Sequence, residues 1–254
     1  MNRYVTYKFD EDGYGVITLN RPEKRNAISL EMIEQFKNAL IQAKEDKGKF
    51  LVLKSIGEKV FCAGGDLNDF HSNVEREKIF EQLSSMKDVL YEIATFPVPT
   101  ICLLSGDAYG GGCELATSCD LRIAKENTKF GFVQSTLGIL PGWGGGALLY
   151  KKVHPSFALH WLMEGKVFSA KYLYDKNWIH RLIKEDSWNE KEILKLYIEK
   201  NHEQMKNLKS QYLSNIDSSF LSEKMAEEVH NCSKLWSSKE HKQAINRILH
   251  KKNK

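Results

Sequence analysis

The stretch SGDAYGGGCELATSCDLRIA, residues 105–124, follows the short apolar segment TICLL at residues 100–104. We expect TICLL to form a buried strand, because it is short, continuous and apolar. Residues 110–117 begin with three glycines and then favour a helix, and LRIA at residues 121–124 returns to a strand pattern. Strand and helix patterns that alternate in this way predict an α/β domain whose sheets are covered by helices.

A second glycine-rich turn, FCAGGDL at residues 61–67, follows the apolar segment FLVLKS at residues 50–55. Glycine lets the backbone approach a ligand closely, and the first turn of a helix carries N–H groups without an intrahelical partner. Two such turns can direct two N–H groups at one oxygen, which is the arrangement of an oxyanion hole for an enolate or a tetrahedral intermediate. Neither turn supplies the GxGxxG or GxxxxGK[ST] spacing of a nucleotide-binding loop.

The rest of the chain divides into an alternating part and a helical part. In the first part we expect a strand over residues 14–20, a helix that starts at the N-cap candidate Ser29, and a long helix over residues 76–96. After Asp186 the sequence becomes helical and rich in Lys and Glu, and we expect helices over residues 188–209, 222–235 and 240–252. The expected boundaries are therefore a core of residues 1–186 and a C-terminal helical region of residues 187–254.

The composition is that of a globular protein: 42% of the 254 residues are hydrophobic and 28% are charged. This excludes a largely disordered chain, and no uncharged apolar run approaches the ~20 residues of a membrane helix. The N-terminal segment has no signal-like apolar stretch, and the five cysteines form no CxxC pair. We expect buried thiols, a cytoplasmic location and no metal site, because the eight histidines also lack HxxxH spacing.

The net charge of +4 is concentrated in the tail, where residues 239–254 contain six Lys or Arg and one Glu. Such a tail is compatible with an anionic small molecule or a nucleic acid, and also with a solvated terminus that binds nothing.

Four segments occur in a distinctive order: Asn20-Arg21-Pro22 with Asn26-Ala27, FCAGGDL, SGDAYGGGCELATSCDLRIA, and LGILPGWGG at residues 137–145. Together they resemble the crotonase family, the enoyl-CoA hydratase/isomerase superfamily, over Val16 to about Leu182. The resemblance implies a crotonase-like spiral of ββα units with a C-terminal helical region that builds homotrimers, which commonly pair into hexamers. It also implies an acyl-CoA substrate and no separate cofactor, because CoA is part of the substrate.

By position, the resemblance assigns the oxyanion hole to the backbone N–H groups of Gly65 and Gly111. It places further residues along the bound acyl-CoA: Lys24, Arg25, Ala27, Ala63, Gly65, Asp66, Leu67, Gly111 and Trp143. Asp66 can instead cap the following helix, and Trp143 can instead pack beneath its own turn. Lys251 corresponds to a lysine that reaches the CoA phosphate of a neighbouring subunit.

The sequence departs from the family at one of two catalytic glutamates. Glu114 stands at the first position, after the GGGxE turn, but Gln134 stands at the second. A glutamine can donate a hydrogen bond but cannot exchange a proton near pH 7. The loss of one acid–base group typically costs 10²–10⁴-fold in rate, or about 3–5 kcal/mol, which argues against an efficient hydratase and more strongly against an isomerase.

Three functional hypotheses therefore remain. The first is an acyl-CoA thioester lyase that stabilises an enolate, in fatty-acid or short-chain acyl-CoA metabolism. The second is a decarboxylase of methylmalonyl- or ethylmalonyl-type thioesters, which needs only one acid and favours a neutral amide beside the substrate carboxylate. The third is a catalytically silent CoA- or RNA-binding member, which the intact Glu114 and glycine turns argue against; we do not expect nucleic acid as a partner.

Several other side chains have structural interpretations. We expect Asp120 and Arg122 to form a structural pair near a strand edge, and Cys113 to be a core thiol rather than a nucleophile. We also expect Trp178, Tyr172 and Tyr174 to be packing residues.

Overall fold

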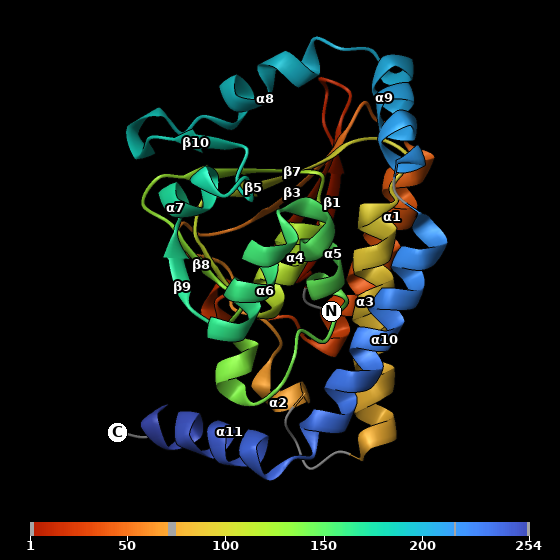
Figure 1. Cartoon of the computed structure of the whole chain (residues 1–254). Helices are drawn as coiled ribbons and strands as arrows, with labels where there is room; N and C mark the ends of the chain where they lie inside the picture. Colours follow the sequence, from red (N-terminus) through yellow and green to blue (C-terminus); the bar gives the residue numbers. More distant parts are fainter. Residues whose placement is uncertain (1–2, 71–74, 216, 253–254) are drawn as a thin grey trace.

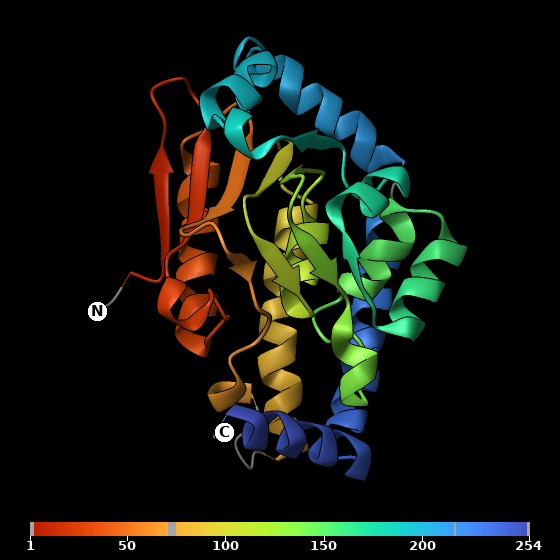
Figure 2. The same ribbon diagram turned by 90° about the vertical axis from the view of Figure 1, so that its left-hand side faces the viewer.

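The computed structural model describes residues 3–70, 75–215 and 217–252. Its larger sheet has six strands in the order β1-β2-β3-β5-β7-β10 (Figures 1 and 2). Only the edge pair β1 and β2 is antiparallel; the other neighbours are parallel. The strands are β1 (Val5–Phe9), β2 (Gly15–Leu19), β3 (Leu51–Ser55), β5 (Thr100–Leu104), β7 (Leu121–Lys125) and β10 (Arg181–Ile183).

The smaller sheet has the order β4-β6-β8-β9, and its strands are β4 (Val60–Cys62), β6 (Asp107–Tyr109), β8 (Lys129–Gly131) and β9 (Val167–Ser169). Each pass of the chain contributes one strand to each sheet, because β3 is followed by β4, β5 by β6 and β7 by β8. A helix follows the strand pair in the first two passes, and the 3-10 helix η2 (Val133–Leu137) follows the third. This confirms the predicted α/β spiral of ββα units.

Helices cover the sheets and carry their apolar side chains toward the core. Ser29 is the N-cap of α1 (Leu30–Glu45), as predicted, because its hydroxyl accepts a hydrogen bond from the Met32 N–H. The other helices before the C-terminal part are η1 (Pro22–Lys24), α2 (Leu67–Phe70), α3 (Arg76–Ala94), α4 (Gly111–Ser118), α5 (Gly145–Lys152), α6 (Pro155–Glu164), α7 (Ala170–Asp175) and η3 (Glu185–Ser187). None of the described helices is long and apolar enough to cross a membrane.

The C-terminal part consists of α8 (Glu190–Ile198), α9 (His202–Ser214), α10 (Ser218–Trp236) and α11 (Lys239–Lys252). The prediction of one helix over residues 188–209 was wrong. Asn201 interrupts it, because the Asn201 side chain accepts a hydrogen bond from the Gln204 N–H and starts a new helix. Helix α10 runs beside α3, and α11 contacts η2 (Figure 1).

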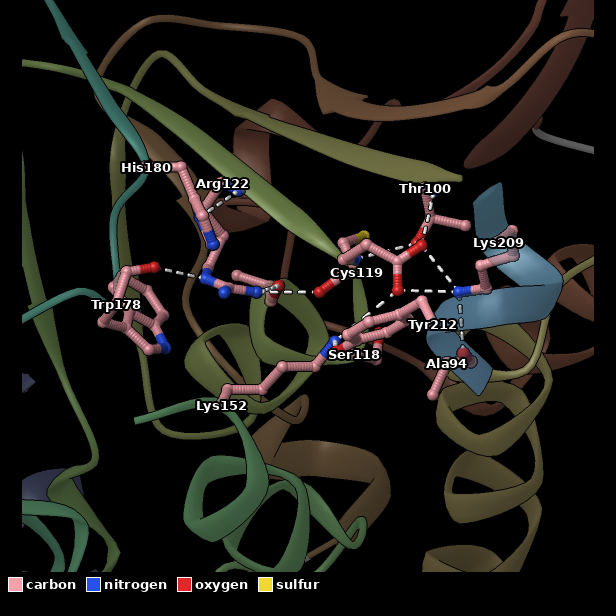
Figure 3. Close-up of polar contacts among 12 residues, drawn as sticks. Ala94, Thr100, Ser118, Cys119, Arg122, Lys152, Trp178, His180, Lys209 and Tyr212 are labelled. Carbon is pink, nitrogen blue, oxygen red and sulfur yellow. Dashed lines mark hydrogen bonds and ion pairs between the residues drawn. The ribbon is translucent and has the colours of Figure 1, made fainter. Parts of the chain in front are cut away.

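The predicted pair between Asp120 and Arg122 was also wrong. Arg122 is fully buried and donates to three backbone carbonyls: Nε to Trp178 at 2.5 Å, and Nη1 to Cys119 at 2.8 Å and Ala116 at 3.3 Å (Figure 3). The last two carbonyls lie at the C-terminal end of α4, where no intrahelical donor is available. Arg122 therefore closes the end of the helix that carries Glu114.

Asp120 pairs with Lys209 of α9 instead. The Lys209 ammonium is 2.6 Å from both Asp120 oxygens and donates to the Ala94 carbonyl, at the end of α3 (Figure 3). Asp120 also accepts from the Thr100 N–H, and Lys152 lies 3.6 Å away. Burial lowers the pKa of Lys209, and it lowers the pKa of Lys152 to about 8. This contact joins α9 to α3 and β5.

All five cysteines are buried and free, as expected. Cys113 is a core thiol whose pKa burial raises well above the ordinary value. Trp178 is buried and Tyr172 packs against the core. Tyr174 was wrongly assigned, because it is 42% exposed and its ring lies beneath the Lys171 ammonium.

We predict that Lys209→Met lowers the free energy of unfolding by about 3 kcal/mol, because it removes the nearer cation from the Asp120 carboxylate and leaves Lys152, 3.6 Å away, to balance its charge. Urea denaturation measures the change. The control is Lys206→Met, an exposed lysine on the same helix, which should change stability by less than about 0.5 kcal/mol. Equal stability of the two variants would contradict the assigned role of Lys209.

Candidate active site

A cavity of about 120 Å³ lies where the two predicted glycine turns meet η2 and the end of α10. Its lining is mostly apolar, and among the described residues its polar side chains are Glu114 and Gln134, apart from the Trp143 and Trp236 indoles. The lining residues are Ala63, Gly64, Gly65, Leu67, Phe70, Leu83, Gly110, Gly111, Glu114, Val133, Gln134, Leu137, Ile139, Leu140, Gly142, Trp143 and Trp236. The structure thus brings seven sequence-predicted residues to one site: Ala63, Gly65, Leu67, Gly111, Glu114, Gln134 and Trp143.

The two glycine turns face one another across the Trp143 indole. A methyl group at Gly111 would fall 2.2 Å from Trp143 Cζ3, and one at Gly65 would fall 3.5 Å from Trp143 Cζ2. Within the described residues, neither the Gly65 N–H nor the Gly111 N–H donates to a protein acceptor. Gly111 is the first residue of α4, where the helix leaves its N–H groups free. Both N–H groups are therefore available to a ligand oxygen.

The Glu114 carboxylate is 2% exposed and is held from two directions. Its Oε1 accepts from Gln134 Nε2 at 2.8 Å and from the Gly142 N–H at 3.2 Å. Its Oε2 accepts from the Trp143 N–H at 2.8 Å and the Gly145 N–H at 3.0 Å. The carboxylate therefore joins α4 to η2 and to the turn at residues 142–145, which precedes and begins α5.

Burial raises the pKa of Glu114 above its ordinary value, although the three backbone N–H groups and the Gln134 amide oppose the shift. A carboxyl group of raised pKa holds a proton more readily near neutral pH. Gln134 is 6% exposed, and its Oε1 accepts no hydrogen bond within the described part of the protein. The site thus offers two backbone donors, one carboxyl group and one unpaired amide oxygen.

This combination can stabilise negative charge on an oxygen while a proton moves at a neighbouring atom. The described residues contain no group of three His, Cys, Asp or Glu side chains that could hold a metal ion.

The residues predicted to contact the CoA portion lie at the edge of the cavity or outside it. Lys24 and Arg25 are exposed, and the Arg25 carbonyl accepts from the Ala63 N–H, which fixes this loop beside the first glycine turn. Ala27 is half-buried and does not line the cavity. Asp66 points to Arg21, which forms an ion pair with it at 2.5 Å. The backbone of Lys251 belongs to α11, but its side chain lies outside the described residues.

Sequence reasoning found Ala63, Leu67 and Trp143 but missed the part of the apolar wall that comes from α3 and α10. Leu83 comes from α3 and Trp236 from the end of α10, where Trp236 Nε1 donates to the Phe70 carbonyl at 3.0 Å. Neither residue has a local signal in the sequence, because each looks like any apolar position of an amphipathic helix. Gly142 could have been found, since it belongs to the glycine-rich segment at residues 137–145.

Comparison with known proteins identifies relatives of this chain. The chain is 38% identical over 160 residues to enoyl-CoA hydratase domain-containing protein 2, mitochondrial, of Bos taurus (62% of this chain, 53% of that protein). It is 33% identical over 165 residues to methylglutaconyl-CoA hydratase, mitochondrial, of Homo sapiens (64% of this chain, 48% of that protein). The matches thus span about half the length of these curated relatives.

Solved structures show the same fold over nearly the whole chain. The enoyl-CoA hydratase from Bacillus halodurans superposes with a TM-score of 0.86 and 24% identity, and covers 96% of this chain and 99% of its own. The enoyl-CoA hydratase from Bacillus anthracis superposes with a TM-score of 0.78 and 25% sequence identity. That match covers 98% of this chain and 96% of the other. The family model described as enoyl-CoA hydratase/isomerase matches residues 10–254. The chain therefore belongs to the enoyl-CoA hydratase/isomerase family.

Proposed function

We propose that the protein is a lyase that acts on short acyl-CoA thioesters through an enolate, with Glu114 as its single acid–base group. The observation that carries this proposal is the convergence of two free N–H groups, Gly65 and Gly111, with a buried carboxyl group in one small cavity. CoA enters as part of the substrate, and no separate cofactor is required.

In this mechanism the thioester carbonyl oxygen lies between the Gly65 and Gly111 N–H groups. These donors are fixed by the fold before the substrate binds, so they need no reorganisation when negative charge develops on the oxygen. The N-terminal end of α4 adds its partial positive charge at Gly111. The cavity wall is apolar, which strengthens both interactions by excluding water.

Hydration of an enoyl thioester is the first candidate reaction. A water molecule adds its oxygen to Cβ, and a proton reaches Cα. The unpaired Gln134 Oε1 supports this assignment, because it can accept a hydrogen bond from that water while Glu114 takes one proton and returns another. Gln134 then positions the water but carries no proton, so Glu114 performs both transfers.

Decarboxylation of a malonyl-type thioester is the second candidate. The C–C bond to the carboxylate breaks, carbon dioxide leaves, and the electron pair remains as the enolate until Glu114 protonates Cα. The neutral amide of Gln134 favours this reaction, because a second carboxylate at position 134 would repel the substrate carboxylate.

The cavity also favours a small acyl group. A cavity of about 150 Å³ holds benzene, so a volume of about 120 Å³ suits an acyl chain of about four carbons. The exposed cations of Lys24 and Arg25 lie beside the first glycine turn, where they suit the anionic CoA. We further propose that Lys251 contacts CoA in a neighbouring subunit of a homotrimer or a dimer of trimers.

Gln134→Glu distinguishes the two reactions. We expect it to raise crotonyl-CoA hydration by about 10²-fold if the enzyme is a hydratase, because it restores a proton carrier. If the enzyme is a decarboxylase, we expect the same change to suppress turnover of methylmalonyl-CoA. Mass spectrometry of the products shows whether each rate rises or falls. Gln134→Met is the uncharged control. No change in either activity would show that residue 134 does not face the acyl group.

Glu114→Gln should lower kcat by about 10²–10⁴-fold in either reaction, because it removes the only acid at the reacting carbons. Binding of unreactive acetyl-CoA, measured by calorimetry, should change by less than about threefold if the turn at residues 142–145 survives. Glu126→Gln, on an exposed residue, is the control. Full activity of a folded Glu114→Gln enzyme would rule out this mechanism, and CoA binding without any turnover by the wild type would favour a silent binding protein.

Acyl-chain selectivity tests the size of the cavity. We expect kcat/KM to fall at least tenfold from a four-carbon to an eight-carbon thioester, since one poorly accommodated methylene already costs about tenfold. Trp236→Ala should reduce this preference by opening the wall. The control is Trp188→Ala, which alters a separate apolar cluster beside α8. A preference for eight carbons in the wild type would contradict the assigned substrate class.

A further inference from the structure

A second carboxylate, Glu228 of α10, binds the same segment of backbone that holds Glu114. Glu228 Oε2 accepts from the Ala147 N–H at 2.7 Å, and its Oε1 accepts from the Gly146 N–H at 3.3 Å. These peptide groups belong to the first turn of α5. Glu228 does not line the 120 Å³ cavity, and the proposed mechanism gives it no role.

The two carboxylates bind neighbouring peptide groups. Glu114 accepts hydrogen bonds from the N–H groups of Gly142, Trp143 and Gly145. Glu228 accepts hydrogen bonds from the N–H groups of Gly146 and Ala147. The segment from Gly142 to Ala147 is therefore held between α4 on one side and α10 on the other.

Close packing leaves this segment little freedom. A methyl group at Gly145 would fall 2.3 Å from Glu114 Cβ, and one at Gly144 would fall 2.5 Å from Met225 Cε of α10. Such contacts are shorter than van der Waals distance, so the backbone lies directly against both helices. A shift of α10 would therefore move the donors that bind Glu114.

The two carboxyl groups also interact through their charges. Burial and the like charge of Glu114 raise the pKa of Glu228, against the opposing effect of its backbone donors. The groups around Glu228 are Tyr150 and Lys151 of α5 and Lys224, Glu227 and Cys232 of α10, while α3 places the apolar Leu83 beside Gly142. Lys224 is paired with Glu227.

We propose that Glu228 is a positioning residue that fixes the Glu114-binding turn from α10. It touches neither substrate nor reacting atoms in this assignment. The inference rests on the proposed function only in giving Glu114 a catalytic use; the anchoring of the turn is a property of the free protein.

The test is a carboxyl ¹³C NMR titration of glutamate-labelled protein without substrate, in which the Glu114 resonance is the one absent from Glu114→Gln. In Glu228→Ala the Glu114 midpoint should move to higher pH by about one unit, because the turn loses its anchor on α10 and its N–H groups, which lower the pKa of Glu114, bind the carboxylate less firmly. In Glu227→Ala, at an adjacent exposed residue paired with Lys224, the midpoint should not move. An unmoved midpoint in Glu228→Ala would overturn the proposal.

A measurement on the wild type keeps the proposal testable if Glu228→Ala does not fold. The Gly146 and Ala147 amide hydrogens should exchange slowly with solvent, because both donate to Glu228, and fast exchange of both would overturn the proposal. Where turnover is measurable, Glu228→Ala should shift the pH profile to higher pH and lower kcat more than it changes KM. Since the titration needs no substrate, an absence of acyl-CoA turnover would refute the proposed function and leave this result standing.

Discussion

The binding of the Glu114 carboxylate by the turn at residues 142–145 is the interaction on which the candidate site depends. It connects α4, η2 and the start of α5 through four hydrogen bonds to one buried group. The same turn carries Trp143, whose indole lies against Gly65 and Gly111. The position of the carboxyl group and the separation of the two glycine N–H donors are therefore set by one short segment of backbone.

Much of this arrangement could be predicted from local signals. The glycines at residues 64–65 and 110–112 indicate that the backbone approaches a ligand closely. Glu114 and Gln134 were placed by the order of the motifs around them. The strand pattern was found where the segments are continuous and apolar, as in β5. Strand β1 was missed because it is short and only partly buried, and its place is determined by pairing with β2 and packing on α1, which are distant in sequence.

The parts of the fold and the site that could not be predicted depend on contacts between distant parts of the chain. Arg122 was expected to pair with its near neighbour Asp120, but satisfying three buried carbonyls determined its position. Asp120 instead pairs with Lys209, which lies 89 residues away in the sequence. Trp236 and Glu228 reach the site region from α10 in the same way. The periodicity of an amphipathic helix predicts which face is buried, but not which element that face will meet.

The contribution of α10 has a consequence for the order of events during protein synthesis. Elements made first fold first as the chain emerges from the ribosome. Both glycine turns and Glu114 are made well before α10, yet Glu228 must dock on α5 and Trp236 on Phe70 before the turn and the cavity wall are complete. A nascent chain that lacks α10 therefore holds the chemical groups of the site without their final geometry. The cavity and the turn reach their final geometry only when the C-terminal helices have been released and have packed.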